Sequence, residues 1–203
     1  MPDRPRQLTP AFEDALVYAA RLHAGQARKG SDTPYISHLM SVAALVLEYG
    51  GSQDQAIAGL LHDAIEDQSH GEPQRLRGEI RRRFGEEALA IVEGCTDTDE
   101  DPKPEWIVRK RRYIARLSHE DSSVALVAVA DKLHNARTMF ADYRAIGDEL
   151  WCRFNAPRDS QLKYLMSIAN AVENQVPSAI IVELREIIGQ LEDPVHRIEQ
   201  WTL

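Results

Sequence analysis

The apolar run from Val124 to Ala130, "VALVAVA", constrains the fold more than any other stretch of the chain. Seven apolar residues in a row fit either a buried strand or a buried helix. The run continues without a turn residue into "DKLHNARTM", which keeps a helical pattern, so one buried helix is predicted. Asp131 ends the run, and a buried carboxylate is costly unless a partner compensates its charge.

Helical periodicity also dominates the rest of the chain. Thr9 and Ser52 stand directly before apolar periodic segments, where such residues cap helix N-termini. Gly85 interrupts a longer helical pattern and predicts a break there. Because no internal repeat or low-complexity linker is found, the sequence predicts an all-α fold with a single domain over residues 1–203. Its motif-bearing core is expected at about 10–145 and further helices at 146–203.

Charge and hydropathy exclude several classes of partner. The net charge of −8 over 203 residues leaves no basic surplus to neutralise phosphates, which argues against a nucleic-acid binder. No apolar stretch approaches the ~18 residues needed to span a bilayer, and the N-terminus lacks an apolar signal core. Cys95 and Cys152 show no metal-ligand spacing. We therefore expect a cytoplasmic protein without nucleic-acid or membrane partners.

The stretch "AGLLHDAIEDQ", residues 58–68, is apolar at its start and densely ionisable at its end. On a helix of 100° per residue, its four ionisable side chains share one arc of about 140°, and they are His62, Asp63, Glu66 and Asp67. The apolar residues fall on the opposite side. Two interpretations compete: a solvated acidic stripe with an incidental histidine, or a metal site with its own acid and base.

Two residues outside this stretch favour the metal site. The adjacent His62 and Asp63 offer an imidazole nitrogen and a carboxylate oxygen to a divalent cation. His38 lies early in the preceding helix, and Asp131 ends the buried apolar run. Both are candidates for further ligands, and a metal would compensate the buried charge of Asp131.

The chain resembles the HD-domain metal-dependent phosphohydrolases, and more closely the alarmone-hydrolase branch of the RelA/SpoT family. The matching blocks are "HAGQARKGSDTPYISHLMSV", "AGLLHDAIED", "RFGEEALAIVEGCTD", "IVRKRRYIARL" and "ADKLHNARTM". They cover roughly Ala15–Asp142 in a specific order. The resemblance implies a single HD-domain helical bundle with a metal site between helices, and a stand-alone small alarmone hydrolase. Leu39 departs from the proline common in the family, and "GSDTPY" from its frequent "SGEPY".

The resemblance also implies roles for individual residues. A divalent cation, typically manganese, is expected to be held by His38, His62, Asp63 and Asp131. The family acids that activate and position the attacking water correspond to Glu66 and Asp67. The residues that contact or neighbour the nucleotide correspond to Arg28, Lys29, Asn135 and Thr138. His23 also matches a family position, but its amphipathic helix favours a packed or supporting histidine over a ligand.

The reaction that the resemblance implies is removal of the 3′-pyrophosphate from ppGpp or pppGpp, which yields GDP or GTP and pyrophosphate. Two alternatives stay open: hydrolysis of another nucleotide, such as an adenine alarmone or a nucleoside phosphate, and a catalytically silent nucleotide-binding regulator. A purely structural helical domain is disfavoured, because it leaves Asp131 and the pair of His38 and His62 unexplained.

Overall fold

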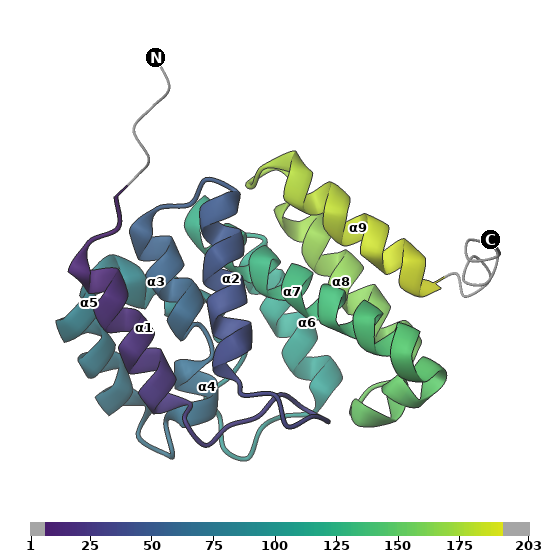
Figure 1. Ribbon diagram of the computed structural model, residues 1–203, viewed down its shortest axis with the longest axis horizontal. Helices are drawn as coiled ribbons and strands as arrows, with labels where there is room; N and C mark the ends of the chain where they lie inside the picture. Colours follow the sequence, from purple (N-terminus) through teal and green to yellow (C-terminus); the bar gives the residue numbers. More distant parts are fainter. Residues whose placement is uncertain (1–6, 193–203) are drawn as a thin grey trace. The chain divides into compact units, whose positions relative to one another are not determined.

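The computed structural model describes residues 7–192 and divides into two compact units, Met1–Lys103 and Pro104–Leu203 (Figure 1). Helices make up both units, and the described residues contain no strand, only one isolated antiparallel bridge between Ala27 and Pro34. The all-α prediction is confirmed. The single domain over residues 1–203 stays a prediction.

The first unit is built around one central helix. Its helices are α1 (Pro10–Leu22), α2 (Ile36–Glu48), α3 (Gln53–Leu61), α4 (Ala64–Gln68) and α5 (Pro73–Cys95). Helix α3 packs against α1, α2 and α5, and every residue from Ala56 to Leu61 is buried. A helical segment that is apolar all round, as Ala56–Leu61 is, belongs in a core. The expected separation into two faces therefore holds for α4, whose Ala64 and Ile65 are buried, but not for α3.

Local signals fix where the helices of the first unit begin and break, as the sequence predicts. The Thr9 side chain accepts a hydrogen bond from the backbone N–H of Ala11 at 3.3 Å. Ser52 and Gln55 form a reciprocal capping box at the start of α3. Gly85 has φ of 94° and interrupts the helical backbone of α5, a conformation that glycine adopts without steric cost.

The helix expected to run without interruption through residues 58–68 is broken at its ionisable centre. Helix α3 ends at Leu61 with His62 as its C-cap, and Asp63 has φ of −95° and ψ of 0° before α4 begins. This bridge region of backbone space is sparsely populated and recurs at active sites. The break is local, since the backbone N–H of Asp67 still donates to the carbonyl of Asp63 at 3.0 Å.

The second unit is organised around the long helix that contains the apolar run. Its elements are α6 (Trp106–Leu117), α7 (Ser122–Ile146), the 3₁₀ helix η1 (Gly147–Arg153), α8 (Arg158–Val172) and α9 (Ser178–Glu192). Helix α7 packs against η1, α8 and α9. All residues of the run Val124–Ala130 are helical and buried, which confirms the predicted helix over the strand alternative.

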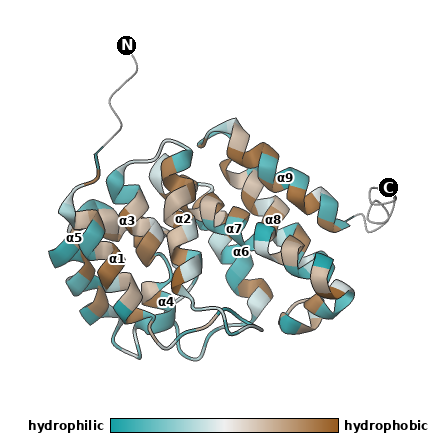
Figure 2. Ribbon diagram, in the orientation of Figure 1, coloured by the Kyte–Doolittle hydropathy of each residue, from teal (hydrophilic) through white to brown (hydrophobic). Residues whose placement is uncertain are grey.

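Hydropathy follows the packing within each unit. Figure 2 shows brown, apolar stretches on α2 and α3 in the first unit and on α9 in the second. The buried residues of α9 include Ile180, Leu184 and Ile188, which recur at helical spacing. Among residues 7–192, no helix combines the length and the apolar character that crossing a membrane requires.

Candidate metal centre

Two buried histidines converge on one carboxylate in the first unit. The Nε2 atoms of His62 and His38 lie 3.0 Å and 3.7 Å from the same oxygen, Oδ2 of Asp63. The two imidazole rings meet edge to face with centroids 5.2 Å apart, and each offers a ligand nitrogen within 4.8 Å of the other. Both histidines are almost fully buried, whereas the Asp63 side chain keeps 22% exposure. The two Nε2 atoms and Oδ2 of Asp63 thus lie close together at a partly accessible position.

The tautomer of His62 is set by a backbone carbonyl. Its Nδ1 lies 2.9 Å from the carbonyl oxygen of Gly59, which can only accept, so Nδ1 carries the proton. In the neutral ring, Nε2 then presents a lone pair toward the Asp63 carboxylate. Two electron-rich atoms at 3.0 Å repel each other unless a proton or a metal cation lies between them. The donor set therefore fits a divalent cation, with Gly59 orienting the ring as partners of metal-binding histidines do.

Tyr35 supports this centre, and the sequence reasoning did not single it out. Its hydroxyl donates a hydrogen bond to Oδ2 of Asp63. Its ring stacks on His23 with centroids 5.4 Å apart and meets His38 edge-on at 5.5 Å. Tyr35 lies close to His38 in "PYISH", so this sequence motif could have pointed to it. His23 is buried and packed, and its pKa lies below the ordinary value because burial disfavours the charged ring.

The two acids expected to handle water differ in their surroundings. Glu66 forms an ion pair with Nζ of Lys103 at 2.9 Å, which links α4 to the loop before the second unit. Asp67 accepts a hydrogen bond from Gln26 Nε2 at 2.8 Å. Burial raises the pKa of Asp67 to about 6, and the Asp63 carboxylate adds to the rise. Neither Lys103 nor Gln26 was marked by the sequence reasoning.

The expected basic pair lies on a turn held at its base by backbone hydrogen bonds. The N–H of Arg28 donates to the carbonyl of Thr33 at 2.8 Å, and that of Tyr35 donates to the carbonyl of Gln26 at 2.9 Å. The Arg28 guanidinium lies 5.8 Å from the centroid of the Tyr35 ring, and Lys29 is exposed. The structure thus brings Arg28 next to the tyrosine that holds Asp63.

In the second unit, Asp131 is buried and has partners on its own helix. It forms an ion pair with Lys132 and accepts a hydrogen bond from Asn135 Nδ2 at 2.5 Å. Burial alone would lower the pKa of Lys132, but the adjacent carboxylate outweighs it and the pKa lies well above its ordinary value. The Thr138 hydroxyl donates to the His134 carbonyl at 2.9 Å. The expected roles of Asp131, Asn135 and Thr138 stay predictions.

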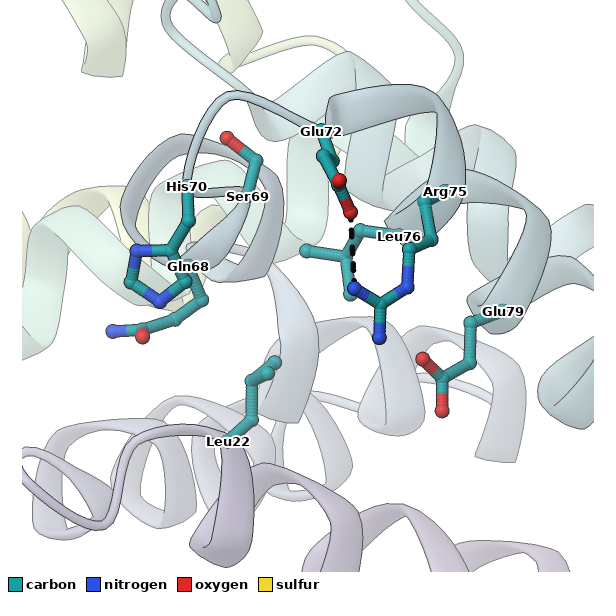
Figure 3. Close-up of a pocket in the computed structure, with 8 residues that line it drawn as sticks. All are labelled: Leu22, Gln68, Ser69, His70, Glu72, Arg75, Leu76 and Glu79. Carbon is teal, nitrogen blue, oxygen red and sulfur yellow. Dashed lines mark hydrogen bonds and ion pairs between the residues drawn. The ribbon is translucent and has the colours of Figure 1, made fainter.

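A cavity of about 400 Å³ lies in the first unit, apart from the residues expected to bind metal (Figure 3). It is lined by Leu22, Gln68, Ser69, His70, Glu72, Arg75, Leu76 and Glu79. Figure 3 shows the Arg75 guanidinium joined to the Glu72 carboxylate, a contact of 3.0 Å. Leu22 and Leu76 supply apolar lining. The lining contains none of the site residues expected from the sequence.

A sequence profile described as an HD domain matches residues 15–156, well over half of the chain. The chain belongs to the HD-domain family. The matched segment of this HD-domain protein includes every residue expected to bind metal, substrate or water. Its adjacent His62 and Asp63 supply the histidine and aspartate at the break between α3 and α4.

Curated relatives of the HD-domain chain include a named alarmone pyrophosphohydrolase and a named GTP pyrophosphokinase. It is 38% identical over 129 residues to guanosine-3′,5′-bis(diphosphate) 3′-pyrophosphohydrolase MESH1 of Xenopus tropicalis, covering 62% of this chain and 68% of the relative. It is 36% identical over 133 residues to a GTP pyrophosphokinase of Streptomyces coelicolor, covering 63% of this chain but only 14% of that relative. The chain therefore spans about one seventh of the longer enzyme.

A solved structure shares the HD-domain fold. A metazoan ortholog of SpoT, described as hydrolysing ppGpp and acting in starvation responses, superposes with a TM-score of 0.73. The match covers 91% of this chain and 97% of that one, at 23% sequence identity. At this identity the likeness shows the fold.

Proposed function

We propose that this protein is a metal-dependent phosphohydrolase that removes the 3′-pyrophosphate from ppGpp or pppGpp. The observation that carries the proposal is the 38% identity to the MESH1 pyrophosphohydrolase over 129 residues. A second support is the approach of His38 and His62 to Asp63, because this donor set suits a divalent cation. The products would be GDP or GTP and pyrophosphate, and the cytoplasmic location remains a prediction from the sequence.

The proposed metal is Mn²⁺ or another divalent cation of similar ligand preference. His38, His62 and Asp63 would hold it, and the resemblance implies Asp131 as the fourth ligand. A cation bound by such a set polarises a phosphoryl group and lowers the pKa of a water molecule. Tyr35 would keep the Asp63 carboxylate in place through its hydrogen bond, and Gly59 would keep the His62 ring oriented.

Glu66 and Asp67 are proposed to act on the attacking water. A carboxylate within hydrogen-bond reach of a water can accept its proton as the phosphorus–oxygen bond forms. A general base works best when its pKa lies near the operating pH, and Asp67, with its pKa of about 6, is closer to that range than an ordinary aspartate. Glu66 is held by Lys103, which leaves it suited to orient the water.

The substrate would be recognised mainly through its charge and its base. Arg28 and Lys29 would meet phosphate oxygens, and arginine also stacks on a planar base. Asn135 and Thr138 are proposed to contact the nucleoside, as the resemblance implies. The exposure of Lys29 and the partial exposure of Arg28 leave both side chains accessible to a ligand.

A substrate panel tests the proposal. The purified protein is loaded with Mn²⁺ and incubated with ppGpp, pppGpp, an adenine alarmone and a nucleoside monophosphate, and the products are identified by mass. We expect GDP and pyrophosphate in equal amounts from ppGpp, and no turnover by the Asp63→Asn variant. Intact ppGpp alongside cleavage of another nucleotide would overturn the substrate assignment, and inactivity on the whole panel would favour the silent regulator.

A further inference from the structure

The carboxamide of Gln26 links three other side chains in the first unit. Its Oε1 accepts from Gln68 Nε2 at 2.5 Å and lies 2.6 Å from Nδ1 of His23. Its Nε2 donates to Oδ2 of Asp67 at 2.8 Å. The four residues come from the end of α1, the following loop and α4, and each is at least partly buried. A loop residue thereby holds a carboxylate of α4.

The chemistry of the neighbours fixes the orientation of this amide. The ionised Asp67 carboxylate can only accept, so the atom of Gln26 that faces it must be the amide nitrogen. The Gln26 oxygen then faces Gln68, whose amide must present its nitrogen. The reversed amide would set its oxygen against the carboxylate and its nitrogen against the Gln68 amide nitrogen. Each position in the network thus has a single compatible role.

The same network is continuous with the metal centre through His23. Because Oε1 of Gln26 is an acceptor, His23 must donate from Nδ1. The His23 ring is 2% exposed and stacks on Tyr35 at an interplanar angle of 19°. Tyr35 in turn donates to Asp63. The position of Asp63 and the position of Asp67 therefore depend on one packed group of side chains.

We propose that Gln26 is a positioning residue of this site: its amide nitrogen fixes the Asp67 carboxylate in the orientation that water activation requires, while His23 and Gln68 prevent the amide from turning. The inference rests on the proposed hydrolysis, in which Asp67 acts on the attacking water. The Gln26 side chain bonds to His23, Asp67 and Gln68, so it would act on the attacking water through Asp67. Its contribution is to restrict the rotamers of Asp67, and loss of such alignment lowers the rate of the chemical step rather than substrate affinity.

Two substitutions separate positioning from simple support of the loop. Gln26→Glu keeps the shape and the acceptor for His23 and Gln68 but replaces the donor to Asp67. Gln26→Met has similar length and removes both donor and acceptor without adding charge. If the donor matters, both variants lose kcat by about 10- to 100-fold, with KM and Mn²⁺ affinity within about threefold of the parent. If Gln26 only supports the loop, the Glu variant keeps its kcat, and this result would overturn the inference.

A matched control tests the change of charge alone. Gln74 lies exposed on α5 in the same unit, outside the site residues. Gln74→Glu makes the same chemical change, and we expect its kcat to equal that of the parent. An equal loss of kcat in this variant would assign the effect to net charge and contradict the positioning role.

A measurement without turnover keeps the inference testable if ppGpp proves not to be the substrate. Solvent exchange of the Gln26 side-chain amide protons is followed by NMR in the metal-free and metal-loaded protein, with the Gln74 amide as reference. We expect slower exchange at Gln26 than at Gln74, and faster exchange at Gln26 in Asp67→Ala. Equal exchange rates at the two amides would refute the inference, whereas an inert parent with a protected Gln26 would refute only the proposed substrate.

Discussion

Asp63 and His62 are neighbours in sequence, and the Asp63 carboxylate lies 3.0 Å from Nε2 of His62 because the helix breaks between α3 and α4. The break leaves His62 buried and Asp63 partly exposed, so one face of the pair is packed and the other is accessible. His38 approaches the same oxygen from α2 at 3.7 Å. The candidate metal centre of this unit is thus a partly exposed carboxylate between two buried imidazole rings.

The first prediction concerns this carboxylate. Asp63→Asn keeps the size of the side chain but removes its negative charge, which is needed to balance a divalent cation between two imidazoles. We expect Mn²⁺ affinity to fall by at least about 100-fold, beyond the effect typical of residues that only support a ligand. Calorimetric titration of the metal-free protein measures it. An unchanged affinity would exclude Asp63 as a ligand.

The second prediction separates metal binding from orientation of the attacking water. Glu66→Gln keeps the size of the side chain but removes the charge that pairs with Lys103 and orients the water, so kcat should fall by about 10²-fold while Mn²⁺ affinity stays the same. Glu72 lines the cavity and is 61% exposed, and Glu72→Gln serves as the control, for which we expect parental turnover. A Glu66→Gln enzyme as fast as its parent would remove Glu66 from the chemistry.

The third prediction follows from the pKa of Asp67, which rises from 3.8 to about 6 in the metal-free fold. The folded state then binds this proton more tightly than the unfolded state. The stabilisation is fully present below about pH 4 and is lost as the pH rises through 6, a change of about 2–3 kcal/mol. Asp67→Asn should therefore raise the melting temperature by several degrees at pH 7.5 and change it little at pH 4.

The Asp67→Asn substitution should change turnover in the opposite direction from stability. An ionised Asp67 is needed to accept a proton from water, so the same Asp67→Asn variant should be stabilised yet slow at pH 7.5. Thermal unfolding of metal-free protein at the two pH values, compared between variant and parent, isolates this carboxylate from other titrating groups such as His23. An identical melting difference at pH 4 and pH 7.5 would contradict the raised pKa.

The fourth prediction concerns the close packing of α3 against α2. A Cβ at Gly59 would lie 3.2 Å from Cα and 3.3 Å from N of Ala43, both backbone atoms. Gly59→Ala should therefore force the helices apart and cost about 1–3 kcal/mol of unfolding free energy. Because the Gly59 carbonyl orients His62, Mn²⁺ affinity should fall as well. Denaturant unfolding and metal titration measure the two effects.

Gly78 provides the matched control for this change. It lies inside α5, and a Cβ there meets no heavy atom of residues 7–192 within 4 Å. Gly78→Ala should stabilise the protein by about 0.5–1 kcal/mol, since alanine loses less conformational freedom in a helix. If both variants changed stability equally, crowding at Ala43 would not be the cause.

The sequence by itself determined the helical elements and the residue types of the site. The capping residues Thr9 and Ser52, the break at Gly85 and the buried helical run Val124–Ala130 are all found as predicted. These features depend on residues a few positions apart, because capping and the 3.6-residue period act over one or two turns. The adjacent His62 and Asp63, together with the surrounding motifs, were enough to indicate the HD-domain family.

Only the tertiary structure decided how these residues meet. The convergence of His38 on Asp63, the hydrogen bond from Tyr35 and the pairing of Lys103 with Glu66 join segments far apart in the chain. The raised pKa of Asp67 arises from desolvation and from a neighbouring carboxylate. Distances between helices and loss of solvent depend on packing, which a local pattern does not encode. For the same reason the network around Gln26 is visible only in the folded chain.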